Sequence, residues 1–188
     1  MKNLRKRMVA EVSLLALLAT VATAGAAPSE DKLLRELESG DSKKVVAAFL
    51  ALEKNYPMSV NVVPYIRKMV SDSREPVKRK AAREAGIFHV DLSPTELNQV
   101  CELLTASDPK AVIDGLKALR DIKRPEAIPN IMPCLKSSNK FILRDSCRTL
   151  AVLGNKDLIP SIEPLLKDPD PGVQKDAQDA ITKLSAKT

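Results

Sequence analysis

The stretch DPDPGVQKDAQDAI, residues 168–181, contains the pattern that decides the fold. Its inward apolar residues are Val173, Ala177 and Ala180. They stand at relative positions 0, +4 and +7, a spacing that places them on one face of an α-helix. Asp170 before Pro171 is typical of a helix start, because an N-cap residue is followed there by proline at the first helical position. The stretch therefore predicts a turn followed by an amphipathic helix.

The same pattern occurs four more times upstream. Taking the first inward residue of each copy as its anchor, the anchors are Val45, Val77, Val112, Leu143 and Val173, spaced by 32, 35, 31 and 30 residues. Fourteen of the fifteen inward positions are apolar. The exception is Glu84, and we expect the adjacent Ala85 to face inward in its place. A period near 30 residues indicates a repeat architecture.

Each of these helices is preceded by another apolar segment. These segments are residues 33–37, 60–70, 96–104, 127–135 and 158–166. The third is opened by a capping box from Ser93 to Glu96, with Pro94 at the first helical position. No segment alternates polar and apolar residues for long, so no sheet is expected. The sequence predicts an all-α fold of about five stacked helical hairpins, with Lys175, Asp176 and Asp179 covering the last one.

Prolines and turn aspartates recur at equivalent places in these hairpins. In the first helices the motifs are Val63-Pro64, Ile128-Pro129-Asn130-Ile131 with Pro133-Cys134-Leu135, and Ile159-Pro160-Ser161-Ile162 with Pro164-Leu165-Leu166. In the second helices they are Asp72 with Val77-Lys78, Leu143-Arg144 with Cys147, and Asp168 with Val173 and Ala177. We expect Pro64, Pro129 and Pro160 to bend their helices unless they fall in the first turn.

In these motifs the chain resembles HEAT-repeat proteins, over roughly residues 29–183. It departs from the family pattern where Val46 and Ile113 replace the basic residue after the anchor. The resemblance implies an armadillo-like α-solenoid whose second helices line a concave face. Such solenoids commonly serve as binding platforms, although a fold alone does not identify a function.

The first 26 residues have the features of a secretory signal peptide. Four basic residues precede an apolar run, residues 12–21, and small residues follow it before Pro28. A run of ten is shorter than a membrane span, although a retained anchor or a buried first helix are alternatives. We expect a signal peptide over residues 1–26, a solenoid domain over 27–188, and no stable membrane span after cleavage. The protein would then be periplasmic or secreted.

Removal of this leader changes the charge of the chain. The leader carries four basic residues and Glu11, a net charge of +3, so the mature chain falls from +6 to +3. A modest positive charge without tryptophan gives little reason to expect nucleic-acid binding.

The sequence offers little for catalysis. His89 is the single histidine, and a general base oriented by Asp91 is a weaker interpretation than a structural residue in a connection. One histidine excludes multi-histidine metal sites, and the scattered glycines form no phosphate-binding loop. We therefore predict a protein that is not an enzyme and needs no metal or cofactor.

Three cysteines, Cys101, Cys134 and Cys147, are an odd number for an oxidising compartment. Cys134 and Cys147 fall on the two helices of one hairpin, where a disulfide is possible. The alternative is three small buried apolar residues.

The second repeat carries the highest density of basic residues, seven against three acidic ones within residues 67–84. Positions +2 and +6 from the anchor, Arg79 and Arg83, are expected to point outward on the second helix. With Lys78 they are our candidate partner-binding residues, for a protein partner with an acidic segment. The alternative is a solvated face with internal ion pairs.

Together these observations predict a non-catalytic protein–protein interaction scaffold exported to the bacterial periplasm or cell exterior, with its partner unidentified. One alternative is a nucleic-acid-binding or repair module that uses the basic residues of repeat two. Another is a HEAT-like bilin lyase, which the scarcity of aromatic residues makes a weak candidate.

Overall fold

The computed structural model describes residues 27–187, and every regular element among them is helical. The α-helices are α2 (Glu30–Leu37), α3 (Ser42–Asn55), α4 (Val63–Met69), α5 (Glu75–Ile87), α6 (Pro94–Cys101), α7 (Pro109–Ile122), α8 (Ile128–Ile131), α9 (Lys140–Leu153), α10 (Ile159–Ile162) and α11 (Pro171–Ser185). Short 3₁₀ helices accompany the later first helices: η1 (Glu102–Thr105), η2 (Pro125–Ala127), η3 (Met132–Lys136), η4 (Lys156–Leu158) and η5 (Glu163–Lys167).

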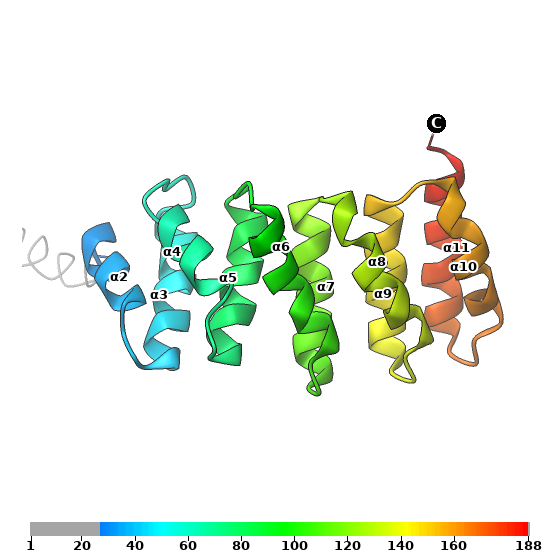
Figure 1. Cartoon of the computed structure of the whole chain (residues 1–188), viewed down its shortest axis with the longest axis horizontal. Coiled ribbons are helices and arrows are strands. Elements are labelled where there is room, and N and C mark those ends of the chain that lie inside the picture. The colour runs from blue at the N-terminus through cyan, green and yellow to red at the C-terminus, as the bar shows by residue number, and fades with distance from the viewer. Residues whose placement is uncertain (1–26, 188) are drawn as a thin grey trace, which may run out of the picture.

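These elements form five helical hairpins that follow one another in a single row (Figure 1). The second helices of the hairpins are α3, α5, α7, α9 and α11. The first hairpin, α2–α3, and the last, α10–α11, lie at opposite ends of the row. The predicted all-α solenoid of five hairpins is confirmed for the described residues. The expected signal peptide, residues 1–26, lies outside them.

The second helices begin and pack as their sequence pattern predicts. Asp41, Asp108, Asn139 and Asp170 each accept a hydrogen bond from the backbone near the start of their helix. All fifteen inward positions are buried, and so is Ala85. Ala85 is buried as expected, but Glu84 is buried as well, because the broad inner side of α5 covers both residues.

The first helices of repeats four and five are interrupted by proline. Pro129 and Pro160 lie in the first turn, where a missing N–H costs nothing, and so they do not bend the helices. The α-helix instead gives way to a 3₁₀ helix at Met132 and Glu163, immediately before Pro133 and Pro164. Those prolines have no N–H for the carbonyl four residues earlier, so the α-helical ladder cannot continue.

The two layers of the solenoid are packed unequally. The second helices of neighbouring repeats pack directly on one another, whereas the first helices of neighbouring repeats touch sparsely. Gly86 on α5 allows a close approach of α7, since a β-carbon there would lie 2.6 Å from the Cβ of Asp121 on α7. The closely spaced second helices therefore form the inner layer, and their outward side is called the second-helix face below.

Candidate interaction surface

The three candidate partner-binding residues of repeat two all bind carboxylates of the next repeat. The Nζ of Lys78 lies 2.7 Å from Glu102. Arg79 forms ion pairs with Asp108 and Asp114, and also with Glu75 of its own helix. Arg83 binds Asp121. The structure therefore places these cations between repeats, as the alternative of internal ion pairs describes.

The outward register expected at Arg79 and Arg83, when applied to the other second helices, fails at one position of repeat three and at both positions of repeat four. Ala118, Asp145 and Thr149 occupy the +2 or +6 positions, yet all three are buried. Each second helix is covered by neighbours on two sides, so its buried side is wider than a single stripe. The hydroxyl of Thr149 donates to the backbone carbonyls of Asp145 and of Leu116 on α7.

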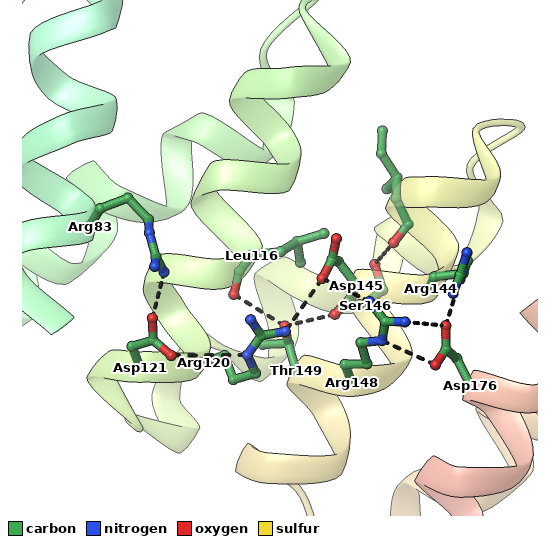
Figure 2. Close-up of polar contacts among 11 residues, drawn as sticks. Arg83, Leu116, Arg120, Asp121, Arg144, Asp145, Ser146, Arg148, Thr149 and Asp176 are labelled. Carbon is green, nitrogen blue, oxygen red and sulfur yellow. Dashed lines mark hydrogen bonds and ion pairs between the residues drawn. The ribbon is translucent and has the colours of Figure 1, made fainter. Parts of the chain in front are cut away.

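A chain of alternating charges crosses the second-helix face from α5 to α11 (Figure 2). It begins with Arg83 and Asp121, and the neighbouring Arg120 reaches Asp145 on α9 at 3.3 Å. It then passes to Arg148 and Asp176.

The last links of this chain join α9 to α11. The Nη2 of Arg148 lies 2.9 Å from Asp176, and the Nε of Arg144 lies 2.6 Å from the same carboxylate. Asp176 was expected to cover the outer end of the core. It faces α9 instead, because two arginines there neutralise it.

Over α9 the arginines lie outside and the carboxylates lie beneath them. The side chain of Arg148 is 43% exposed, whereas those of Asp145 and Asp176 are 9% and 8% exposed. Arg120, Arg144 and Arg148 share these two aspartates. This end of the second-helix face therefore exposes more guanidinium groups than carboxylates.

Two exposed apolar side chains flank these arginines on α9. Phe141 is 53% exposed and Val152 is 40% exposed. With Arg144 and Arg148 they follow helical spacings of three, four and four residues, so they share the outward side of α9. We name these four residues the α9 stripe. The Nζ of Lys140 lies 5.6 Å from the centre of the Phe141 ring.

One hollow adjoins the α9 stripe, and two others lie elsewhere on the solenoid. A hollow of about 290 Å³ beside the stripe is lined by Arg148, Ala151 and Val152 together with residues of α7 and α11. A second, of about 310 Å³, lies at repeat two between Val46, Lys80 and Lys110. The largest, about 630 Å³, lies between the first helices of repeats four and five, where Pro129, Met132 and Pro164 make it mainly apolar.

His89 is an exposed residue in the connection after α5. It follows α5 with a φ of 51°, and the N–H of the next residue, Val90, bonds back to the carbonyl of Ala85. Asp91 binds Arg124 at 3.2 Å. Among the described residues no group of acidic, histidine or cysteine side chains could hold a metal ion, and no helix is long and apolar enough to cross a membrane.

The three cysteines are buried free thiols, so the possible disulfide between Cys134 and Cys147 is not formed in this structure. Burial raises the pKa of the Cys134 thiol, and the hydroxyl of Ser146 lowers it in part. Burial raises the pKa of the Cys147 thiol to about 12 and that of Cys101 to about 11. Thiols of this kind are protonated and unreactive.

Comparison with known proteins agrees with this architecture. A family model described as HEAT repeats matches residues 97–182. Over these residues, which span repeats three to five, the chain is similar to HEAT-repeat proteins. No curated protein matches the sequence.

Solved structures with the same fold are similar over most of the chain. One belongs to the complex of CpcE and CpcF of phycocyanin lyase from Nostoc sp. PCC7120, with a TM-score of 0.71, 20% identity, and coverage of 88% of this chain and 68% of that one. A designed armadillo repeat protein has a TM-score of 0.58, 16% identity, and coverage of 81% and 80%. An engineered protein has a TM-score of 0.60, 19% identity, and coverage of 83% and 79%.

Sequence reasoning missed the α9 stripe. The basic residues of α9 are fewer than those of repeat two, so a count of charges along the chain favours repeat two. The signal that could have found the stripe is an apolar residue at an outward position, Phe141, two residues before the anchor Leu143.

Proposed function

We propose that this HEAT-type solenoid is a non-catalytic scaffold that binds another polypeptide along its second-helix face, with the α9 stripe as the main contact. The partner that fits the stripe carries a carboxylate between apolar side chains. We also propose that it acts in the bacterial periplasm or outside the cell.

The observation that carries this proposal is the layering of charges over α9. Two nearly buried aspartates hold three arginines in place, and the outer edges of those guanidinium groups face solvent between Phe141 and Val152. Arginines fixed in this way lose little conformational freedom on binding a carboxylate, which favours affinity. Aromatic and arginine side chains together are also typical of energetically important positions in protein interfaces.

The likeness to a chain of the CpcE–CpcF complex adds support for a polypeptide partner, since that solenoid was solved in a complex. It is a likeness of fold, and an enzymatic role does not follow from it. The nucleic-acid alternative draws less support, because Lys78, Arg79 and Arg83 each have a carboxylate of their own, so the candidate residues of repeat two offer phosphates no excess of positive charge.

Affinity capture tests the proposal directly. A C-terminally tagged chain is isolated with its bound proteins from envelope extracts of cells that produce it, alongside a variant carrying Phe141→Ala and Val152→Ser. We expect a specific protein with the parent chain and its loss with the variant. Calorimetry on the purified pair should then show at least tenfold weaker binding by the variant, and weaker binding by the parent in 0.5 M salt.

A matched control comes from the other end of the molecule. Met58 and Val60 are 90% and 76% exposed in the connection between α3 and α4, so Met58→Ala with Val60→Ser removes a similar apolar area far from the α9 stripe. Equal loss of binding in both variants would refute the assignment of the surface. Recovery of the tagged chain from the cytosolic fraction with its leader intact would refute export.

A further inference from the structure

Glu84 is the most deeply buried carboxylate among the described residues. It lies on α5, its side chain is 0% exposed, and neither of its oxygens has a hydrogen-bond partner that meets ordinary geometric criteria. Asp145 and Asp176 are also buried, but each binds arginine. An ionised carboxylate in such a place is costly, so the environment of Glu84 favours its protonated form.

Two charged groups face Glu84. Lys80, one turn earlier on α5, is in ion-pair contact with it, and the same Nζ lies 2.9 Å from Glu53 on α3. One cation is therefore shared between two carboxylates, one of which is buried. Burial is the main reason that the pKa of Glu84 rises to about 7; Lys80 lowers it and Glu53 raises it again.

The other elements that pack on α5 direct their charges elsewhere. Arg67 of α4 binds Glu96, while Asp114 and Asp121 of α7 bind Arg79 and Arg83. Neutralisation of Glu84 thus depends on Lys80 alone, and Lys80 is also the link from α5 to α3.

We propose that Glu84 is a proton-sensitive lock that holds the first hairpin, α2–α3, against the rest of the solenoid. When Glu84 is protonated, Lys80 forms its ion pair with Glu53 alone and so connects α5 to α3. When Glu84 is ionised, two negative charges compete for one ammonium group at the α3–α5 interface, and the first hairpin is held less tightly. Because Lys80 and Val46 also line the hollow at repeat two, loosening changes that part of the second-helix face.

Hydrogen exchange of the full chain between pH 5.5 and 8.5 tests the lock. Exchange rates are corrected for the intrinsic effect of pH, and the protection of α2–α3 amides is divided by that of α9 amides in the same sample. We expect this ratio to fall at least tenfold between pH 6 and pH 8. In Glu84→Gln, which stays neutral, the ratio should stay constant.

Glu53→Gln provides a second variant that keeps Glu84 titratable. It removes the competing charge, so Lys80 can pair with Glu84 alone when Glu84 ionises, and the fall in protection should disappear. A protection ratio independent of pH in the parent chain overturns the proposal, and so does an unchanged fall in Glu84→Gln. If Glu84→Gln does not fold, a fall in Glu53→Gln as large as that of the parent chain is the result that overturns it.

Discussion

Gly86 on α5 lies against Asp121 on α7 so closely that a β-carbon at position 86 would stand 2.6 Å from the Cβ of Asp121. Gly86→Ala must therefore push the two helices apart. We expect it to lower the free energy of unfolding by about 2 kcal/mol, the usual cost of overpacking. Gly40→Ala is the control, since its β-carbon meets nothing within 4 Å. Urea unfolding followed by circular dichroism measures both, and equal stabilities of the two variants would contradict the close packing of α5 and α7.

The shared carboxylate of Asp176 gives a second prediction. Asp176→Asn removes the charge that holds Arg144 and Arg148, and should cost about 2 kcal/mol of stability, as for other charge-assisted hydrogen bonds. Asp179→Asn on the same helix changes an exposed residue with no ion pair among the described residues, and should alter stability by less than about 0.5 kcal/mol. A double-mutant cycle of Asp176→Asn with Arg148→Gln should show coupling between the two sites. Additive effects would mean that the observed contact contributes nothing.

The end of α7 offers a stabilising substitution. Lys123 adopts the left-handed conformation, with φ of 60°, where a β-carbon is unfavourable. Lys123→Gly should raise the free energy of unfolding by about 0.5–1 kcal/mol. Lys117→Gly, within the same helix, should lower it by about 1 kcal/mol. Thermal unfolding of the two variants should therefore shift in opposite directions from that of the parent.

The buried thiols predict how the cysteines react. Because burial keeps all three protonated and covered, native protein at pH 8 should react with a thiol reagent far more slowly than a free cysteine does. After unfolding in denaturant without reductant, three thiols per chain should be counted. A count of one after isolation from an oxidising compartment would show that two of the three cysteines are bridged, and would contradict the buried free thiols.

The stability of the protein should also depend on pH through Glu84. Its pKa is about 7 when folded, against an ordinary value of 4.5 when unfolded, so the folded state binds the extra proton between these values. The contribution of Glu84 to stability is therefore fully present below pH 4.5 and falls as pH rises to 7, by about 3 kcal/mol. Subtracting the unfolding free energy of Glu84→Gln from that of the parent at each pH isolates this contribution. A constant difference from pH 4 to pH 8 would contradict the burial of a titrating carboxyl.

The repeat pattern was enough to predict the fold because its register is set by burial. Val45, Val77, Val112, Leu143 and Val173 are all buried, and even Glu84 occupies the inward position that the spacing assigns to it. Sequence reasoning rejected Glu84 because a charge is costly inside a protein. It could not anticipate that Lys80, one turn away, would accompany the carboxylate.

The interaction surface was harder to predict because it depends on contacts between repeats. Each arginine binds an aspartate that lies 25 to 38 residues later in the sequence, on the next second helix. These aspartates are Asp114, Asp121, Asp145 and Asp176. A local count of charges shows a basic repeat two, whereas the stacked helices pair its cations with carboxylates and leave three arginines to share two aspartates at α9. Which cation remains available to a partner is therefore a property of the stack and not of any single helix.

The unequal packing of the two helix layers has a mechanical consequence. A row whose inner layer is in close contact and whose outer layer touches sparsely bends most easily by opening or closing the spaces between its outer helices. Curvature can then change with little loss of buried surface, while the inner layer keeps its length. We therefore expect the solenoid to bend elastically, so that its curvature can adjust to the size of a bound partner without unfolding any hairpin.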